Sequence, residues 1–501
     1  MPLQSFTVSD FHTGIVSDET IQSDGNSVMV DVDLTGKDGY VGANRTLTAM
    51  TEAAAPNNID TTITCMEGFG VNTGIGIFYA IGSTKIFKYD AIAGGGWTKK
   101  NTNAKACQGY ESLKTFGGYL YYTSDGFLGR TADGEAFVDD YKTLKIATQY
   151  DFRPMIVFAG QLCIGDGNYL GVLDAAGTFN DDALILDSNL TITSLAIMAG
   201  RLYIGTMDKN YLGQSAGSKM FVWDGAAATP DDAFDLQIGG VSAMIEFKNR
   251  LIVWGGSQGK MYEFNGATLD PLSSSINIGD RSFDGAYGYP FPNAVTKLNN
   301  VLYWGISVAN QINSKPLKGV WSLSQRDSSK PLALVRSFSS SDGENLDVDS
   351  IYPRSAATDQ LFISRDGGSA ATIGIDATAS GPTGDYSTGG YIETPRYEFP
   401  AEVQFAGISV NVKKPSGTEA LVVSYDLDDT GSYTSLGTYT SSNYNQILYP
   451  EYSANCRYLK LKFAWTPQAY AVTPVYPKTI WLAGYTVYYK LYGKYYSRQF
   501  N

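Results

Sequence analysis

The segment FAGQLCIGDGNYLGVLD, residues 158–174, decides the fold, because a close copy of it follows in the same chain. The copy reads MAGRLYIGTMDKNYLG and occupies residues 198–213. Both segments place a turn of small residues before a Leu and then alternate apolar residues. Each then turns again and reaches Asn-Tyr-Leu-Gly. A chain that repeats such a pattern is building one structural unit several times.

The two segments belong to a longer series with the same internal pattern. A period near 40–45 residues with several short strands in each period is typical of the blades of a β-propeller. Seven blades are favoured, and six remain an alternative if the first or last unit is incomplete or is completed by another segment. The anchor residues, 40 to 59 residues apart, are Ile77, Leu120, Leu162, Leu202, Leu251, Leu302 and Leu361.

Each unit reads as a meander of antiparallel strands joined by tight turns. The first two strands are separated by two residues of a kind that tolerates the positive φ of a short hairpin. We expect the Leu anchors at 120, 162, 202, 251 and 302 to be buried within their blades. The turn pairs are Gly117-Gly118, Ala159-Gly160, Ala199-Gly200, Lys248-Asn249 and Asn299-Asn300.

The composition changes after the last repeat. Residues 376–390, DATASGPTGDYSTGG, are rich in Gly, Ser and Thr and read as a linker. The strands that follow alternate strictly, with Ile408, Val410 and Val412 on one face and Leu459, Leu461, Phe463 and Trp465 on another. The sequence therefore predicts an all-β chain. Its parts are an N-terminal extension with a first strand (1–50), a β-propeller (51–380), a β-sandwich (391–490) and an aromatic tail (491–501).

Charge and composition exclude several function classes. The net charge of −13 disfavours sequence-specific binding to nucleic acid, which needs a basic surface. The four Cys residues are far apart and without a neighbouring His, so we expect reduced, mostly buried thiols rather than a metal site. The first twelve residues lack the charged and apolar regions of a secretory signal, and no apolar run is long enough for a membrane helix.

No arrangement of catalytic residues is recognisable. The chain holds one His, His12, in a polar N-terminal stretch. TADGEAF (131–137) and SRDGGSA (364–370) match the Asp boxes of sialidase propellers only in part. Asp426, Asp428 and Asp429 are a weak Ca²⁺ candidate, with a charged hairpin turn as the favoured interpretation. We expect no cofactor and no enzymatic activity.

The two ends of the chain are candidates for contacts with neighbouring chains. Tyr is frequent at protein interfaces because its ring is apolar while its hydroxyl tolerates water. The N-terminal stretch is polar with isolated aromatic residues, too few to fold alone and enough to dock. The interface candidates are Tyr495, Tyr496 and Phe500 at the C-terminus with Phe6 and Phe11 at the N-terminus.

The segment at 10–50 and the segment GGYIETPRYEF at 389–399 resemble virion proteins of tailed bacteriophages, in particular tail nozzle or tail-tubular proteins. The first segment runs from an aromatic residue and a Gly through a valine–aspartate strand to a Gly and an Arg. The second opens the part of the chain after the propeller. The matching residues of the first segment are Phe11, Gly14, Val30, Asp31, Val32, Asp33, Gly39 and Arg45.

The resemblance implies a structural part of a phage tail, made in the host cytoplasm and located in the virion. Its partners would be other tail proteins and further copies of itself, with a hexameric ring favoured. DNA would pass through an acidic lumen, where like charge prevents adhesion. The alternative is a carbohydrate-binding or glycan-hydrolysing propeller involved in receptor recognition. Oligomeric state distinguishes the two hypotheses.

Overall fold

The computed structural model divides the chain into two compact units. Unit 1 comprises residues 1–46, 322–338 and 379–501, and unit 2 comprises residues 47–321 and 339–378. Within them the structure describes residues 3–8, 28–30, 32–33, 41–70, 77–83, 85–90, 95–102, 112–146, 152–208, 218–236, 239–255, 260–272, 287–309, 319–324, 333–338, 347–354, 360–367, 372–378, 386–387, 389–413, 415–452, 455–468 and 479–491.

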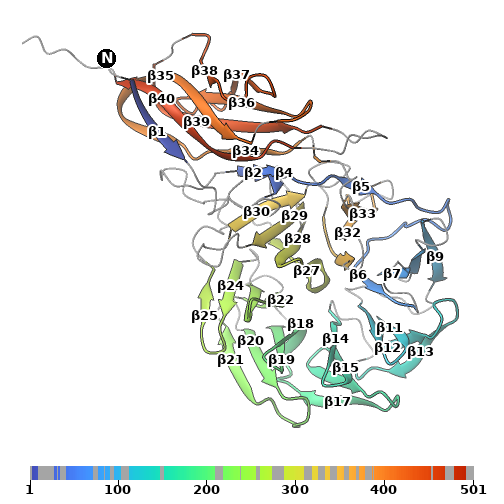
Figure 1. Cartoon of the computed structure of the whole chain (residues 1–501). Helices are drawn as coiled ribbons and strands as arrows, with labels where there is room; N and C mark the ends of the chain where they lie inside the picture. The colour runs from blue at the N-terminus through green and yellow to red at the C-terminus, as the bar shows by residue number, and fades with distance from the viewer. Residues whose placement is uncertain are drawn as a thin grey trace, which may run out of the picture. The chain divides into compact units, whose positions relative to one another are not determined.

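Unit 2 is a β-propeller whose first five blades are four-stranded antiparallel meanders (Figure 1). The first blade contains β6 (Cys65–Gly68), β7 (Ile77–Gly82), β8 (Lys85–Asp90) and β9 (Trp97–Thr102). The second contains β10 (Leu113–Phe116), β11 (Tyr119–Ser124), β12 (Phe127–Thr131) and β13 (Phe137–Thr143). The third contains β14 (Met155–Phe158), β15 (Gln161–Asp166), β16 (Tyr169–Leu173) and β17 (Phe179–Ile185).

The fourth blade contains β18 (Leu190–Met198), β19 (Arg201–Asp208), β20 (Ser218–Trp223) and β21 (Asp232–Leu236). The fifth contains β22 (Val241–Phe247), β23 (Arg250–Gly255), β24 (Lys260–Phe264) and β25 (Leu269–Pro271). The sixth is built on β27 (Val295–Leu298), β28 (Val301–Ala309) and β29 (Gly319–Ser324), with β26 (Tyr287–Tyr289) paired to the end of β28.

The seventh blade combines strands from both ends of the propeller sequence. Its first three strands are β31 (Ile351–Arg354), β32 (Gln360–Arg365) and β33 (Gly374–Thr378). The fourth is β5 (Leu47–Ala49), which pairs with β33 in the register Thr48↔Ala377. The first strand of each blade contacts the first strand of the next, and β31 contacts β6, so the ring closes with seven blades. An N-terminal strand thus completes the last blade.

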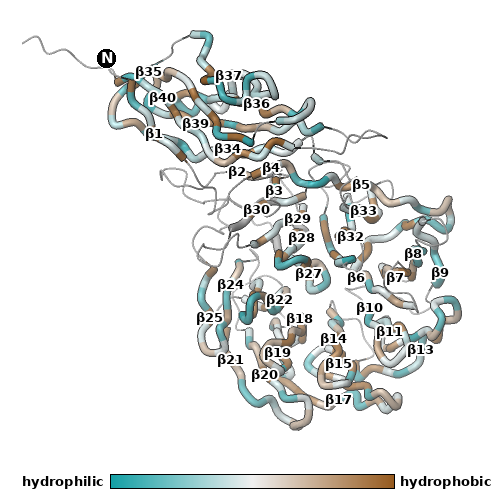
Figure 2. The backbone as a smooth tube through the Cα atoms, in the orientation of Figure 1, coloured by the Kyte–Doolittle hydropathy of each residue, from teal (hydrophilic) through white to brown (hydrophobic). Residues whose placement is uncertain are grey.

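The blade pattern expected from the sequence is confirmed. The five Leu anchors have no exposed surface in the blades. Every predicted turn pair has positive φ, for example 50° at Ala159 and 75° at Gly160. The middle strands, such as β15, are the apolar ones, whereas outer strands such as β21 and β25 are more polar (Figure 2). These polar outer strands have little apolar periodicity, so they leave little signal in the repeated sequence pattern.

Unit 1 is built around one hydrogen-bonded sheet. Its strands include β1 (Leu3–Val8), β40 (Leu482–Leu491), β35 (Tyr397–Val412), β39 (Asn455–Thr466), β34 (Tyr391–Glu393) and β2 (Val28–Val30), in this order. β36 (Ala420–Leu427) pairs with β39 and with β37 (Thr434–Tyr439), while β38 (Ile447–Leu448) pairs with β35. β30 (Ala333–Phe338) pairs with β2, and β3 (Val32–Asp33) pairs with β4 (Gly42–Ala43).

The predicted alternation in unit 1 is confirmed, but a two-sheet sandwich is not. Leu459, Leu461, Phe463 and Trp465 are buried, with half-buried residues between them. β35 lies between β39 and β40 in this sheet. Its pairing with β39 runs from Tyr397 to Gln404 with a register shift after Glu398, and its pairing with β40 runs from Val403 to Val412. β35 therefore joins into one continuous hydrogen-bonded sheet the strands that the sequence predicts as two separate layers.

The unit boundaries differ from the predicted domains at one internal segment. Residues 322–338 were expected within the propeller, yet they belong to the same unit as both chain ends. The reason is the pairing of β30 with β2, at Val30↔Arg336, and the burial of Val335 in the apolar core of unit 1. In the described part of the chain, no helix is long and apolar enough to cross a membrane.

Candidate functional site

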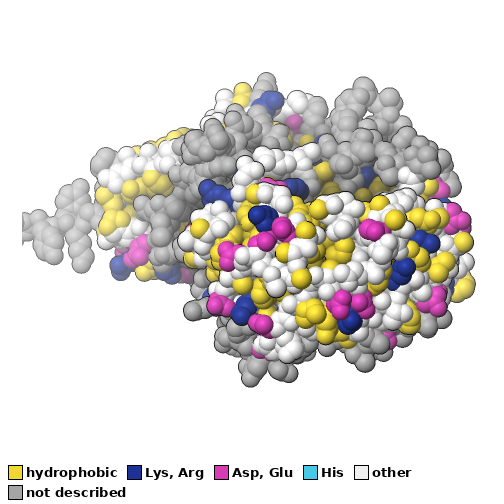
Figure 3. Space-filling view, turned by 90° about the horizontal axis from the view of Figure 1, so that it is seen from below, with side chains coloured by type: hydrophobic (Ala, Val, Ile, Leu, Met, Phe, Trp, Pro, Cys, Tyr) yellow, Lys and Arg dark blue, Asp and Glu magenta, His cyan; other side chains and the backbone are white. Residues whose placement is uncertain are grey.

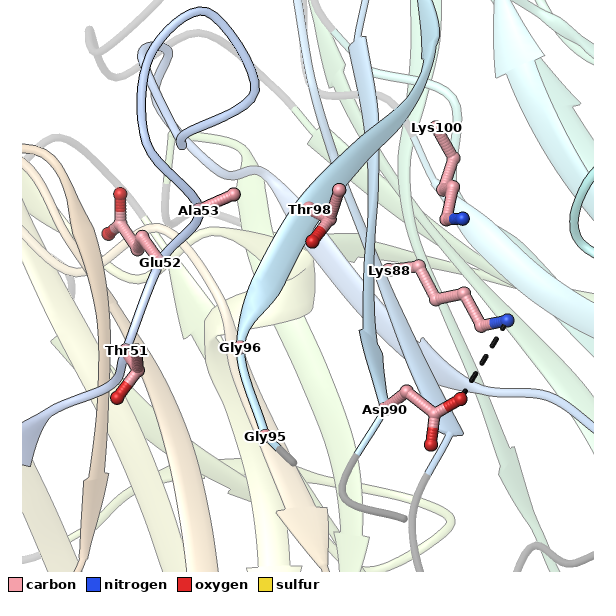
Figure 4. A pocket seen from close by; sticks show the side chains of 9 residues that line it. All are labelled: Thr51, Glu52, Ala53, Lys88, Asp90, Gly95, Gly96, Thr98 and Lys100. Atoms are coloured by element: carbon pink, nitrogen blue, oxygen red, sulfur yellow. Dashed lines mark ion pairs between the residues drawn. The ribbon is translucent and has the colours of Figure 1, made fainter. Parts of the chain in front are cut away.

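A groove of about 400 Å³ lies at the outer edge of the first blade (Figure 4). One wall is the segment that follows β5, and the other is formed by β8 and β9. The lining residues are Thr51, Glu52, Ala53, Lys88, Asp90, Gly95, Gly96, Thr98 and Lys100.

The groove exists because the segment after β5 runs beside β9. The amide of Trp97 donates to the carbonyl of Thr51 (2.9 Å), and the amide of Ala53 donates to the carbonyl of Trp97 (2.8 Å). Gly95 has a φ of 68°, a value that most side chains disfavour, where the chain enters β9. Residues that close the ring between the seventh and first blades therefore also form a wall of the groove.

The cationic wall is balanced by a carboxylate from the second blade. Glu135 accepts from Lys88 (2.9 Å) and from Lys100 (3.0 Å), and Lys88 also lies 4.0 Å from Asp90. The hydrogen bond from Lys88 is the main reason why the pKa of Glu135 is lowered. These ion pairs connect the outer strands of two neighbouring blades. They also show that the two ammonium groups together hold one anionic group.

Glu52 is directed away from these lysines (Figure 4). Its Oε2 accepts from the amide of Ile59 (3.1 Å). Burial raises the pKa of Glu52, while the Ile59 amide and the nearby Arg365 guanidinium lower it. Arg365 Nε in turn lies 3.0 Å from Asp376 Oδ1 in a buried ion pair. Within residues 51–59, the closure segment between β5 and the first blade, Glu52 is therefore held by the Ile59 amide and by the nearby charge of Arg365 rather than standing free in the groove.

The groove suits the binding of a polar ligand. Thr hydroxyls, Lys ammonium groups and exposed glycine backbone provide hydrogen bonds, and its charged side chains are held by ion pairs. The lining contains neither His nor Cys, the usual residues for base or thiol chemistry. The sequence analysis missed this site because it forms only when residues 51–53 fold against β9. The single local signal is the run Gly94-Gly95-Gly96.

The candidate Ca²⁺ residues lie around the hairpin turn between β36 and β37. Asp426 accepts from the amides of Thr430 (3.0 Å) and Gly431 (2.9 Å). Asp428 accepts from the amide of Arg457 (2.7 Å), and Asp429 pairs with Lys460 (2.6 Å). The three carboxylates thus stabilise a charged hairpin turn through hydrogen bonds and an ion pair. Across the described ranges, no group of three His, Cys, Asp or Glu side chains is arranged to hold a metal ion.

The two partial Asp boxes have structural contacts. Asp133 Oδ1 accepts from the amides of Glu135 and Ala136, both at 2.8 Å, which fixes the turn between β12 and β13. Asp366 accepts from the hydroxyl of Thr62 and is bridged to Asp347 through backbone hydrogen bonds of 2.8 and 3.0 Å. His12 lies outside the described residues.

The thiols that the structure describes are buried and reduced, as expected. Cys65, Cys163 and Cys456 form no disulfide. Burial raises the pKa of each of these thiols to about 12, so they stay protonated and unreactive near neutral pH. Cys107 lies outside the described residues.

Of the interface candidates, the structure describes only Phe6. Its ring packs against its own unit, with centroids 4.8 Å from Tyr397 and 6.4 Å from Phe399. β1 pairs with β40 and directs this ring inward, where it is half-buried, and a role of Phe6 in contacts with a neighbouring chain stays a prediction. Phe11, Tyr495, Tyr496 and Phe500 lie outside the described residues.

No protein-family model and no curated protein matches the sequence. Among solved structures, a catalytically inactive virginiamycin B lyase from Staphylococcus aureus is similar at 10% identity and a TM-score of 0.44, over 66% of this chain and 99% of that one. The extracellular domain of the one-component system BT4673 from B. thetaiotaomicron is similar at 13% identity and a TM-score of 0.44, over 81% of this chain and 48% of that one. A chain of the Mitotic Checkpoint Complex is similar at 12% identity and a TM-score of 0.44, over 72% of this chain and 99% of that one. Similarities at this level carry no activity over to this chain.

Proposed function

We propose that this chain is a structural component of a bacteriophage tail, part of a ring around the DNA path that contributes to tail assembly and genome delivery. The main support is that the two segments with the phage resemblance contact each other. β2, from the valine–aspartate segment, pairs with β34, which opens the segment after the propeller, in the register Met29↔Ile392. More than 350 residues of sequence separate these strands. Two loosely matched motifs that pair in one β-ladder support the phage resemblance more than either motif does alone.

Further contacts of the N-terminal segment extend this ladder. The guanidinium of Arg45, one of the matched residues, lies 4.2 Å from the ring centroid of Tyr386. Val41 and Leu482 exchange two backbone hydrogen bonds of 2.8 Å. The N-terminal segment thus contributes to unit 1 at several points before it supplies β5 to the propeller. Such extensive use of backbone pairing supports a role in architecture.

Polar side chains on the propeller support the same role. On the face shown in Figure 3, basic and acidic side chains are interspersed in small groups rather than gathered into one basic surface. Ion pairs also connect outer parts of the propeller. Lys145 contacts Asp182 (3.0 Å), and Lys219 contacts Asp187 (3.1 Å). Exposed pairs of this kind contribute little to stability, and they offer no continuous track for a phosphate backbone.

The test is to image the purified full-length chain by electron microscopy and to localise it on phage particles with a specific antibody. We expect a closed ring of copies, with six favoured, and labelling confined to the tail. A chain that stays monomeric at assembly concentrations, together with unlabelled tails, would contradict the proposal.

The second candidate is a glycan-binding propeller, and the groove of the first blade is the observation that favours it. Sugar hydroxyls would find Thr51, Thr98 and Lys100 as partners. A glycan-array screen of the wild-type chain and a Thr98→Val/Lys100→Met variant distinguishes the candidates. Binding that the variant loses, by a chain that forms no ring, supports the receptor function over the tail function.

A further inference from the structure

The edge strand β1 lacks the features that protect the outer edges of the first five propeller blades. Within the described residues, β1 pairs with β40 alone and ends the sheet of unit 1 (Figure 1). Six consecutive pairs, from Leu3↔Lys490 to Val8↔Tyr485, run without a register shift. The strand reads LQSFTV and contains no charge, no Pro and no Gly. A flat, uncharged edge of this kind readily accepts another strand.

The outer strands of the propeller show how the same chain protects an edge. Each of the first five blades ends in a strand with charged side chains, and β25 also ends in Pro271. Charges and Pro on an edge strand are common devices against unwanted pairing. The charged residues are Lys99 and Lys100 in β9, Asp139 and Asp140 in β13, Asp181 and Asp182 in β17, Asp232 and Asp235 in β21, and Asp270 in β25.

One other edge strand of unit 1, β37, is also uncharged, but it is irregular. Its register with β36 shifts next to Val423, and Gly437 within it has a φ of 150°. The side chain of Leu448 lies 3.1 Å from the position of a Cβ at Gly437, so β38 approaches this strand. β1 has neither an irregularity in its pairing nor such a neighbour among the described residues.

β1 is anchored by one face and presents the other. Val8 is buried, and the Phe6 ring lies between Tyr397 and Tyr489, with centroids 4.8 and 6.4 Å away. Leu3 and Ser5 point to the opposite, exposed face, and Leu3 is 55% exposed. The Thr7 hydroxyl is 2.9 Å from that of Thr486. The strand is therefore held against β40, and none of the described residues pairs with its outer edge.

The C-terminal tail of a second copy has the properties of a strand that fits this edge. Residues 492–501 read YGKYYSRQFN, long enough to pair with all six residues of β1 and rich in Tyr, which favours strands. β40 ends at Leu491, beside the start of β1, so the tail begins next to the edge. A tail of the same chain would have to cross over the end of β1 and turn back, whereas consecutive strands lie side by side in about two-thirds of cases. A tail from a neighbour avoids this crossing, and the same contact repeated from copy to copy closes a ring.

We propose that the outer edge of β1 binds residues 492–501 of a second copy as an added β-strand. The proposal assigns a contact to the ring proposed above. Only the closure of the copies into a ring rests on that earlier proposal. Main-chain hydrogen bonds would provide the affinity, as in other cases of strand addition. Exposed Leu3 would pack against a Tyr of the incoming tail.

A peptide-binding experiment tests the edge directly. The probe is a fluorescent peptide of residues 490–501, and the receptor is the chain truncated after Leu491, so that its own tail cannot compete. We expect saturable binding that a Leu3→Lys/Ser5→Lys variant weakens by about tenfold or more. The matched control is Ile185→Lys, which adds a charge at an exposed apolar residue of an edge that already carries Asp181 and Asp182. No binding at about 100 µM peptide, or equal binding by the Leu3→Lys/Ser5→Lys variant, would overturn the proposal.

Disulfide trapping then identifies the donor of the tail. Ser5→Cys and Ser497→Cys are introduced into two separate full-length chains in which Cys107 is replaced by Ser. We expect the mixture to form a disulfide-linked dimer on mild oxidation, and neither chain alone to form this species at the same rate. A third chain carries both Ser5→Cys and Ser497→Cys. If only this chain reacts, and its disulfide forms within one chain, the tail binds its own β1 and the proposal fails. These measurements need no virion, so their outcome is independent of the localisation result.

Discussion

At the scale of single residues, the anchor leucines carry the packing of the blades. Leu202 is fully buried in a cluster with Ile204, Phe221 and Trp223. We expect Leu202→Ala to destabilise the propeller by roughly 2–5 kcal/mol, because the truncation loses apolar contacts and leaves a cavity. Ile185→Ala, at a residue that is 55% exposed, is the control and should change stability by less than about 0.5 kcal/mol. Denaturant titration of both variants checks this, and similar costs at the two positions would mean that the blade register is wrong.

Glu52 makes the stability of the folded chain depend on pH. Burial raises the pKa of Glu52 above that of the unfolded chain, so the folded state binds the proton more tightly. The stability from this group is therefore fully present below the unfolded pKa and is lost as pH rises through the folded pKa. We expect the unfolding free energy of wild type to fall relative to that of Glu52→Gln as pH rises from acid to neutral. A difference that is constant with pH, measured by denaturant titration at each pH, would show that Glu52 does not titrate differently in the two states.

At the scale of elements, the two-residue turns set the register of each hairpin. Ala159 and Gly160 have φ values of 50° and 75°, and a Cβ at Gly160 would meet no atom within 4 Å. Gly160→Ala should therefore cost about 1–2 kcal/mol from backbone strain alone, since no steric contact is involved. Ala159→Gly should be neutral or slightly stabilising, because it relieves the same strain at the preceding residue. Thermal unfolding of the two variants tests this pair, and an equal loss in both would point to contacts rather than φ.

The elements also show why part of the fold was predictable. Strands with apolar middle residues and turns that need positive φ leave a local pattern in the sequence. The buried Leu anchors and the turn pairs are both predicted from this pattern. The outer strands are stabilised by pairing with their neighbour and by ion pairs such as Lys100–Glu135, which leave no periodic signal. The groove at Thr51 and Thr98 depends on a contact between a segment before the first blade and a strand within it. Such contacts between distant residues are not encoded in local periodicity.

At the scale of the whole molecule, closure of the ring depends on one short strand. β5 precedes the first blade in the sequence but pairs with β33 of the seventh blade. Thr48 and Ala377 are direct partners on β5 and β33, and a disulfide there would link residues that lie more than 320 positions apart. We expect a Thr48→Cys/Ala377→Cys chain to unfold at a higher temperature when oxidised than when reduced. In the loop-entropy description the gain reaches about 5 kcal/mol for such a long loop, before any strain in the native state is subtracted.

The reduced form of the same variant is the control, because it carries both substitutions without the cross-link. Its midpoint should lie close to that of wild type, since Thr48 is exposed and Ala377 is only half-buried. If oxidation leaves the midpoint of the propeller unchanged although the disulfide has formed, the blades unfold without separating at this seam. Stability would then be distributed around the ring, as expected for repeats that depend mainly on their nearest neighbours. A large shift would instead show that the β5–β33 seam separates when the propeller unfolds.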